Sequence, residues 1–423
     1  MNKMSLGIRR VEKGLFTIIF AILCLGIASL FAAGTIKDVK LPLILALLVA
    51  IIFIGAHLLL EKWKSAADPY IFPLAAMLSV IGLIMILRLS PDLVIRQTIW
   101  ILAGLVVFVL TAAGLRDYRF LEEYKYLYIF LGLFLLLSTI IFGTTVGGAR
   151  SWLNLGYFKF QPSELVKIIL VIFLASYLEE KKEILTQGTR SFLGVQVPSL
   201  QYIGPLLVMW GFSLILLIFQ KDLGAALIFF GSFLAMIFIA TGRWSYLFSG
   251  TLLFAIGALL CYFLFNHVQV RVSIWLNPWN DIEGKGYQII QSLFAVGSGG
   301  LYGTGLGLGQ PMLIPAVHTD FVFSAWAEET GLLGAVALLI IYCLLIYRGF
   351  TIALKADNGF GTLLAAGLTT MFAIQTLVIV GGVIKLFPLT GVTLPFVSYG
   401  GSSLVSNYIL LGLLMNISAK NGA

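Results

Sequence analysis

A polar segment, Asn277-Pro278-Trp279-Asn280-Asp281, contains the side chain best suited to transfer a proton. Asp281 lies close to Trp279 in sequence, and aromatic neighbours could remove water from the carboxylate, as a general base that works near neutral pH requires. The segment continues as Gly284-Lys285-Gly286 and so places a cation close to the acid in sequence. An ordinary carboxylate in a surface turn is the alternative interpretation.

Two further segments carry charges that could bind an anion. Arg150 stands in Gly-Gly-Ala-Arg-Ser-Trp, and Glu164 and Lys167 stand in Gln-Pro-Ser-Glu-Leu-Val-Lys at the start of an apolar run. Glu164 and Lys167 have the i, i+3 spacing that places two side chains on one helix face, where they can pair. Because ionisable groups within a membrane are costly and usually face a cavity, the two residues either form an internal ion pair or line a polar cavity.

Glycine, histidine and serine clusters follow. Residues 297–309 hold a run of glycines whose spacing could be mistaken for a dinucleotide fingerprint, but that motif needs a preceding strand in a βαβ unit. Tight turns with close backbone packing, or amides that cradle a phosphate, are the alternatives. His318, in His-Thr-Asp-Phe with Asp320, is either a packing histidine or a metal ligand or proton carrier. Ser402 stands among small residues typical of close helix packing.

The composition predicts which elements position these residues. Of the 423 residues 60% are hydrophobic and 11% are charged, whereas soluble proteins carry about 25% charged residues. We therefore predict an all-α polytopic membrane protein with about twelve transmembrane helices. The predicted spans are 15–33, 41–60, 71–89, 97–115, 126–142, 161–178, 204–220, 223–241, 245–266, 325–347, 360–382 and 394–417. The first run is longer than a signal-peptide core of about 7–15 residues, which favours a retained helix.

The loops between these spans predict the orientation. More Lys and Arg residues fall on the side of the N-terminus, so both termini are predicted to be cytoplasmic. The net charge of +8 is spread over short loops, and no basic block indicates nucleic acid. The three cysteines lie far apart in apolar runs and predict neither a disulfide nor a zinc site. The long connection 267–324, between the ninth and tenth spans, is too apolar for disorder, so we expect an ordered extracytoplasmic loop, partly at the membrane surface.

In this order, the clusters resemble the SEDS family (shape, elongation, division and sporulation) of bacterial membrane proteins, which includes RodA, FtsW and SpoVE. The resemblance covers about residues 70–417 and also rests on Arg96-Gln97 with Trp100, Asp222-Leu223-Gly224, Glu328-Glu329 and Leu394-Pro395-Phe396-Val397-Ser398. The chain departs from the family at Ile282-Glu283, where Pro and a variable residue are usual, and at Gln220-Lys221-Asp222, where Gln-Pro-Asp is common. Residues 1–65 are extra to the usual ten-helix core, so we expect an accessory two-helix block before a core at 66–423.

The resemblance implies a peptidoglycan glycosyltransferase of the bacterial plasma membrane that polymerises lipid II, a disaccharide-peptide on a polyprenyl pyrophosphate. It implies a class B penicillin-binding protein as partner and Asp281 as the catalytic residue, and the departure beside it makes Glu283 a second candidate base. Glycosyl transfer also needs positive charge for the departing pyrophosphate. The leading cations are Arg150 and Lys167, the secondary ones are Arg271 and Lys285, and the other candidate substrate-binding residues are Glu164, His318, Asp320 and Ser402. A divalent cation (Mg or Mn) could share this task, and no organic cofactor is expected.

Two other functions stay open on the sequence. A lipid II flippase would suit twelve helices and an intramembrane Lys167, although no inverted repeat or paired broken helices stand out. A non-enzymatic scaffold that recruits a penicillin-binding protein is the third alternative. Both predict that Asp281 is dispensable, whereas a glycosyltransferase needs a base. These residues do not distinguish a role in elongation from one in division or sporulation.

Overall fold

The computed structural model describes residues 3–63, 66–115, 117–146, 149–154, 156, 158–187, 190–192, 195–197, 204, 211 and 213–421. Its contacts divide the chain into two compact units. Unit 1 comprises Met1–Arg116, Val272–Arg348 and Gln375–Ala423, and unit 2 comprises Asp117–Arg271 and Gly349–Ile374. Within the described residues, 10 helices are long and apolar enough to cross a membrane, which confirms the predicted all-α polytopic class. The number of twelve is not confirmed, and most of the predicted span 204–220 lies outside the described residues.

The regular secondary structure in the described part of unit 1 is helical, with loops between the helices. Its α-helices are α1 (Lys3–Ala32), α2 (Lys40–Trp63), α3 (Ile71–Leu89), α4 (Val94–Val109), α12 (Tyr287–Ser298) and α15 (Gly401–Asn421). Short turns of 3-10 or π-helix are η1 (Pro91–Leu93), η2 (Leu110–Gly114), η3 (Pro278–Asp281) and η4 (Pro311–Leu313). The helices α11 (Asn266–Leu276), α13 (Val322–Lys355) and α14 (Gly359–Val383) each contribute residues to both units.

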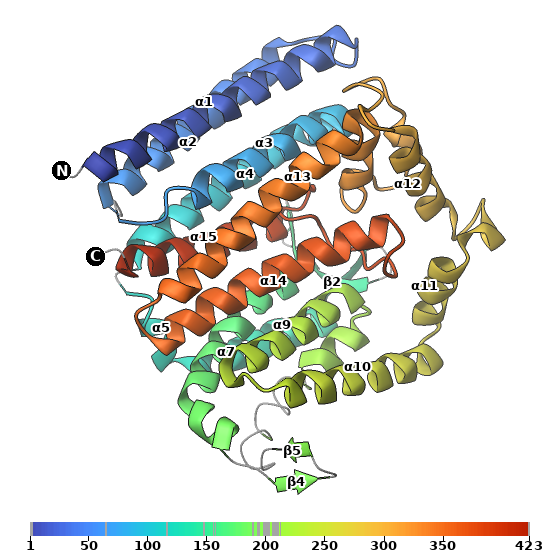
Figure 1. Ribbon diagram of the computed structural model, residues 1–423. Helices are drawn as coiled ribbons and strands as arrows, with labels where there is room; N and C mark the ends of the chain where they lie inside the picture. Colours follow the sequence, from blue (N-terminus) through green and yellow to red (C-terminus); the bar gives the residue numbers. More distant parts are fainter. Residues whose placement is uncertain are drawn as a thin grey trace. The chain divides into compact units, whose positions relative to one another are not determined.

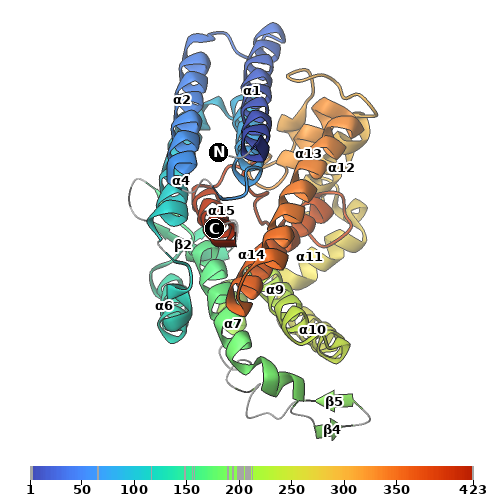
Figure 2. The same cartoon turned by 60° about the vertical axis from the view of Figure 1, so that its left-hand side comes forward.

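Aromatic and small residues make the core of unit 1. The α1 and α2 helices lie side by side in both views (Figures 1 and 2), and the ring of Phe16 packs against the ring of Phe72 in α3 at 5.5 Å. A row of rings continues from Phe72 through Phe108 in α4 to Tyr408 in α15. Gly104 allows α4 to approach the Tyr408 ring closely, because a Cβ at this position would lie 2.3 Å from the ring. Apolar helices alone do not drive association in lipid, so close contacts of this kind hold the bundle together.

Unit 2 consists mostly of helices with short strands at their ends. Its elements are α5 (Phe120–Glu123), α6 (Lys125–Phe142), α7 (Pro162–Gln187), α9 (Leu223–Thr241), α10 (Trp244–Leu264), β1 (Thr144–Val146), β2 (Ala149–Asn154), β3 (Lys159–Phe160), β4 (Arg190–Phe192) and β5 (Val195–Val197). The strands β1, β2 and β3 pair antiparallel in that order, and β4 pairs with β5. The three-stranded sheet connects α6 to α7 and therefore fixes where α7 begins.

The last predicted span begins seven residues too early. Residues 394–400 are apolar but not helical, and α15 begins at Gly401. Pro395 restricts the residue before it, and Phe396 adopts a left-handed backbone with φ +65°. This segment, which contains a turn at residues 395–397, lies against α3, where a Cβ on Gly82 would stand 2.7 Å from the Phe396 carbonyl oxygen. Hydropathy measures only the side chains and cannot detect such a break in the backbone.

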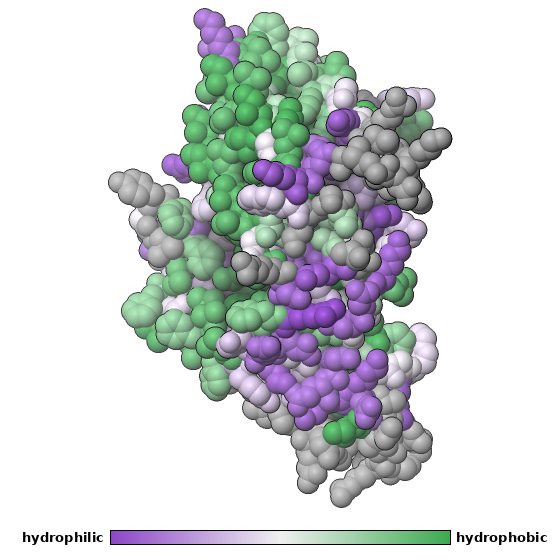
Figure 3. Space-filling view, turned by 90° about the vertical axis from the view of Figure 1, so that its left-hand side faces the viewer, coloured by the Kyte–Doolittle hydropathy of each residue, from purple (hydrophilic) through white to green (hydrophobic). Residues whose placement is uncertain are grey.

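The first and last helices place the chain ends together. In unit 1, α1 begins and α15 ends at the same end of the bundle (Figure 1). Figure 3 views the molecule from that side and shows hydrophilic side chains gathered over part of the face, with hydrophobic side chains beside them. The predicted cytoplasmic side, and the predicted boundary at residue 65, stay predictions.

Candidate functional site

Asp281 ends a short 3-10 helix in the long connection of unit 1. The Asn277 side chain caps this helix by accepting a hydrogen bond from the Trp279 backbone N–H (3.3 Å). The Lys285 backbone N–H donates to Asp281 Oδ2 (3.0 Å), and the Gly286 backbone N–H donates to the Asp281 carbonyl oxygen (3.0 Å). The chain therefore turns around Asp281 and fixes both its backbone and its carboxylate.

Two glycines make this turn possible. A Cβ at Gly284 would lie 2.3 Å from Asp281 Oδ1 and 2.6 Å from Oδ2. A Cβ at Gly286 would lie 2.2 Å from the Pro278 carbonyl oxygen. The Gly-Lys-Gly spacing thus has a physical reason. A side chain at Gly286 would meet the backbone of the turn, and one at Gly284 would displace the Asp281 carboxylate.

The environment of Asp281 differs from the one predicted. Its side chain is exposed, so aromatic neighbours do not enclose it and remove its water. The aromatic ring of Trp279 is itself 49% exposed, and Ile282 is 50% exposed. An exposed carboxylate beside exposed apolar side chains, with Lys285 also exposed four positions on, suits a surface that meets both water and lipid.

Residues 299–310, the glycine-rich loop, pack against the backbone of α13. Gly303, Gly305 and Gly307 have φ of +85°, +103° and +89°, and a Cβ at Gly303 would lie 2.3 Å from the Glu329 carbonyl oxygen. The α13 helix breaks at Gly331 (φ +69°, ψ −169°), where the Leu332 backbone N–H donates to the Gly300 carbonyl oxygen (2.9 Å). The glycine run therefore serves tight turns and close packing, and the dinucleotide interpretation is excluded by the helical surroundings.

Buried charges hold this loop. Arg88, at the end of α3, donates from Nε to Glu329 Oε1 (2.7 Å) and from Nη2 to the Gly309 carbonyl oxygen (2.9 Å). Glu329 Oε2 accepts from the Gly307 backbone N–H (3.0 Å), and Glu328 Oε1 accepts from the Gln310 backbone N–H (2.7 Å). Both glutamates are buried, although adjacent residues of a helix point in different directions. The sequence analysis did not single out Arg88, and only its position near the end of the predicted span 71–89 could have suggested this role.

The remaining unit 1 candidates lie in packed surroundings. The His318 ring contacts the Tyr399 ring (6.0 Å), and its carbonyl oxygen accepts from the Tyr399 backbone N–H (2.9 Å). Burial lowers the pKa of His318 below its ordinary value, as expected for a packing histidine. Asp320 is half-buried, and Ser402 is 4% exposed in the first turn of α15.

In unit 2, Glu164 and Lys167 form the ion pair that their spacing predicts. Lys167 Nζ lies 2.9 Å from Glu164 Oε2, and the two side chains are 3% and 8% exposed, respectively. Of the two interpretations, the geometry favours an internal ion pair. The cost of burying each charge is offset only while the other is present.

The Arg150 side chain caps the C-terminal end of α6. Its Nε donates to the Gly143 carbonyl oxygen (3.0 Å) and its Nη2 donates to the Ile141 carbonyl oxygen (3.3 Å), at the C-terminal end of α6. A guanidinium is favourable there because the last carbonyls of a helix lack partners and carry partial negative charge. The side chain is exposed and sits on β2, whose backbone N–H at Arg150 donates to the Gln220 carbonyl oxygen (2.9 Å).

Asp222 was not among the candidate site residues of the sequence analysis. Its Oδ1 caps α9 by accepting from the Ala225 backbone N–H (3.1 Å), and its Oδ2 accepts from Gln161 Nε2 (3.1 Å) and Ser163 Oγ (3.2 Å). It thus connects the starts of α7 and α9. The Asp-Leu-Gly string that the resemblance used was the available signal, because an aspartate before an apolar run is a typical N-cap.

The candidates therefore form separate groups. Asp281 and Lys285 belong to one turn of unit 1, while Arg150, the Glu164–Lys167 pair and Arg271 belong to unit 2. Within the described ranges, three or more His, Cys, Asp or Glu side chains do not gather anywhere as a metal site would require.

Comparison with known proteins decides the family. Over residues 68–422 the chain matches the family of FtsW, RodA and SpoVE, described as cell cycle protein. The chain belongs to this family. Its FtsW/RodA/SpoVE relatives include "Peptidoglycan glycosyltransferase RodA" of Mycobacterium bovis, 42% identical over 382 residues, which are 87% of this chain and 81% of that protein. "Stage V sporulation protein E" of Bacillus subtilis is 35% identical over 371 residues, 84% of this chain and 98% of the relative.

Solved structures of family members share the fold. One, described as "Structural coordination of polymerization and crosslinking by a peptidoglycan synthase complex", has a TM-score of 0.69 and 32% identity, covering 84% of this chain and 98% of that one. The crystal structure of Thermus thermophilus RodA has a TM-score of 0.61 and 28% identity, covering 83% of this chain and 96% of the other. The chain is thus a multi-pass membrane protein, and the resemblance drawn from its motifs is confirmed.

Proposed function

We propose that this protein is a peptidoglycan glycosyltransferase that polymerises lipid II in the bacterial plasma membrane. Its membership of the FtsW/RodA/SpoVE family and the names of its relatives support this activity. The observation that carries it is the fixed, exposed carboxylate of Asp281 among exposed apolar side chains. A lipid-linked sugar needs such a surface, because its head lies in water and its chain lies in the bilayer.

In the proposed reaction, Asp281 takes the proton from a sugar hydroxyl of the acceptor. The hydroxyl oxygen then attacks the anomeric carbon of the donor while the bond from that carbon to the pyrophosphate breaks. The electron pair leaves with the polyprenyl pyrophosphate, and the configuration at the anomeric carbon inverts. A single base is sufficient for direct displacement, and the Asp281 turn presents one fixed carboxylate. Glu283, which is also exposed, is the second candidate.

The departing pyrophosphate needs positive charge. We compare the candidate cations by the contacts that each already makes within the protein. Lys167 is compensated by Glu164, and Arg150 divides its donors between two carbonyls of α6. Lys285 is exposed and belongs to the same turn as Asp281, so we favour it for this task over the two leading candidates of the sequence analysis. His318, Asp320 and Ser402 are proposed to shape the surroundings of the site.

A divalent cation such as Mg²⁺ would neutralise substrate phosphates, and Asp281 is the carboxylate that could reach it. Hard cations of this kind are often held by one or two carboxylates together with substrate oxygens and water. The residues that the structure describes do not form a protein cage for such an ion.

We further propose a class B penicillin-binding protein as partner and a topology with both termini in the cytoplasm. The similar structure described as a peptidoglycan synthase complex that coordinates polymerization and crosslinking supports a partner of this kind. The excess of Lys and Arg in the loops on the side of the N-terminus supports the topology.

Purified full-length protein, given labelled lipid II with and without a candidate partner, tests the activity. We expect glycan polymer that is longer or faster to form when the partner is present. A protein that makes no polymer under either condition, yet moves lipid II across vesicles, would be a flippase and would contradict the proposal.

A further inference from the structure

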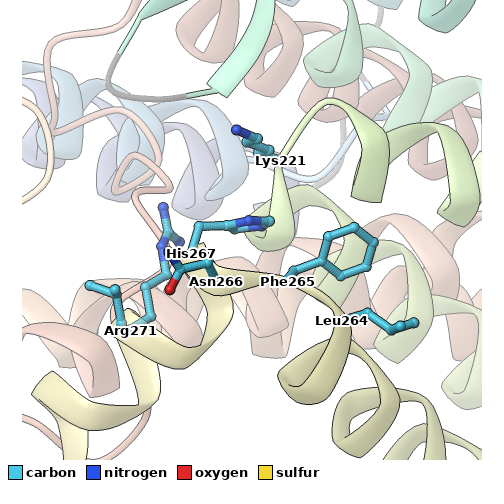
Figure 4. A pocket seen from close by; sticks show the side chains of 7 residues that line it. Lys221, Leu264, Phe265, Asn266, His267 and Arg271 are labelled. Carbon is cyan, nitrogen blue, oxygen red and sulfur yellow. The ribbon is translucent and has the colours of Figure 1, made fainter.

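A pocket of about 540 Å³ in unit 2 gathers basic side chains at the end of an apolar helix (Figure 4). Three of its lining residues are basic: Lys221, His267 and Arg271. The others are Leu264, Phe265, Asn266 and Val270. None of these described lining residues is acidic, so the part of the wall that they form is positively charged.

Two separate elements bring the basic residues together. His267 and Arg271 are four residues apart on α11 and so lie on one face of that helix. Lys221 comes from the turn before α9, where it adopts a left-handed backbone with φ +61°. This turn is fixed by the Asp222 backbone N–H, which donates to the Leu217 carbonyl oxygen (3.0 Å). A lysine in this conformation is unusual, because the left-handed region favours glycine or asparagine.

The electrostatics of His267 show how the three groups act on one another. Burial lowers the pKa of His267, and the positive charges of Lys221 and Arg271 lower it further. His267 Nε2 is buried and, within the described part of the chain, has no hydrogen-bond partner. An anion placed among these groups would offset the mutual repulsion and accept a hydrogen bond from the ring.

The pocket opens where a lipid-facing helix ends. In the apolar stretch of α10 that is long enough to cross a membrane, no residue is buried within the protein. Phe263 and Leu264, at the end of α10, are 67% and 71% exposed. A helix this apolar and this exposed faces acyl chains. Its end therefore lies near the depth of the lipid headgroups. His267 and Arg271 follow this end in the chain, and Lys221 lines the same pocket.

We propose that Lys221, His267 and Arg271 bind the phosphate group of an anionic lipid headgroup. The phosphate oxygens accept charge-assisted hydrogen bonds from the three basic groups, and the lipid chain lies along Leu264 and Phe265. A bilayer phospholipid and a lipid-linked sugar pyrophosphate share this chemistry. Only the lipid-linked sugar as a source rests on the proposed glycosyltransferase function. Because lipid binding is measured without turnover, the pocket proposal can be refuted without refuting the glycosyltransferase proposal, and the reverse.

Lipid binding to the full-length protein in detergent tests the site. Native mass spectrometry would compare short-chain phosphatidylglycerol, phosphatidylcholine and farnesyl pyrophosphate as probes. We expect Lys221→Gln or Arg271→Gln to weaken phosphatidylglycerol binding about tenfold or more, the size expected for loss of a charged hydrogen bond. The matched control is Lys159→Gln, which removes an exposed charge elsewhere in unit 2 and should leave the affinity unchanged.

The probes also distinguish the sources. Tighter binding of phosphatidylglycerol indicates a bilayer phospholipid, and tighter binding of farnesyl pyrophosphate indicates the lipid-linked sugar. Equal affinity for phosphatidylglycerol and phosphatidylcholine, or wild-type affinity for phosphatidylglycerol in both variants, would overturn the proposal.

The pH dependence of binding reports on His267 itself. Phosphatidylglycerol keeps a constant charge near neutral pH, and the charged groups that face His267 are Lys221 and Arg271. An anion favours the protonated ring, so binding should tighten as the pH falls from about 8 to about 6. His267→Gln should remove this dependence. A variant that keeps the wild-type pH profile would exclude His267 from the site.

Discussion

Substituting Gly284 by alanine separates the position of the proposed base from the stability of the fold. The added Cβ would lie 2.3 Å from Asp281 Oδ1, whereas ordinary contacts of a Cβ begin near 3.4 Å. The carboxylate must therefore move by about 1 Å. It is the free end of an exposed side chain, so this movement costs little stability.

The expected loss of activity follows from this displacement. Moving a reacting group by about 1 Å can reduce the rate by about 100-fold. We therefore expect Gly284→Ala to lower the rate of lipid II polymerisation by about two orders of magnitude, with a melting temperature close to that of the wild type. In Gly286→Ala, by contrast, the Cβ meets the Pro278 backbone oxygen at 2.2 Å, so that variant should also lose stability.

The assay compares purified variants, each with the same partner protein and labelled lipid II. Gly297→Ala is the matched control, because nothing lies within 4 Å of a Cβ at this position of α12. The control should polymerise at the wild-type rate. If Gly284→Ala did so as well, the carboxylate would not need the position in which the turn holds it, and the reasoning would be refuted.

Three further predictions concern the packing of unit 1. Arg88→Met leaves Glu329 buried without its partner, so the free energy of unfolding should fall by about 3–5 kcal/mol, and an unchanged melting temperature would contradict the role of the pair. Gly331→Ala forces a side chain into a backbone with φ +69° and should destabilise by at least about 1–3 kcal/mol, whereas Gly55→Ala, with open space around it, should not. Because the pKa of His318 is lowered in the folded protein, the unfolded chain binds a proton first as the pH falls, and stability decreases below about pH 6.5. His318→Gln should therefore lose less stability than the wild type between about pH 7.5 and about pH 5.5 in thermal unfolding, and an equal loss would assign the pH effect to other groups.

The sequence predicts what depends on local spacing. The Glu164–Lys167 pair follows from an i, i+3 spacing, and the close packing of the glycine run follows from the conformations that only glycine adopts easily. Ten of the twelve predicted spans follow from hydropathy, because each has a membrane-spanning helix at its place among the described residues. The predicted start of the last span, at residue 394, was wrong because the left-handed backbone of Phe396 interrupts the helix within an apolar run. Composition does not reveal such a backbone conformation.

Contacts between residues far apart in sequence could not be predicted. Arg88 donates to Glu329, 241 residues away, although the two residues belong to different predicted spans. This contact, together with the one from Arg88 to the Gly309 carbonyl oxygen, holds the glycine-rich loop. Arg150 was expected to bind an anion because its type suits one, yet its donors meet the carbonyls at the end of α6. The exposure of Asp281 likewise depends on how the loop folds rather than on the aromatic residues beside it in sequence.

The central claim is that the Asp281 carboxylate is the base of glycosyl transfer. The most direct test is polymerisation of labelled lipid II by Asp281→Asn, which keeps the size of the side chain but removes its basicity, with Glu283→Gln as the matched control. We expect Asp281→Asn to bind its partner, melt like the wild type and make no polymer, while Glu283→Gln remains active. Wild-type polymer from a folded Asp281→Asn protein would contradict the claim.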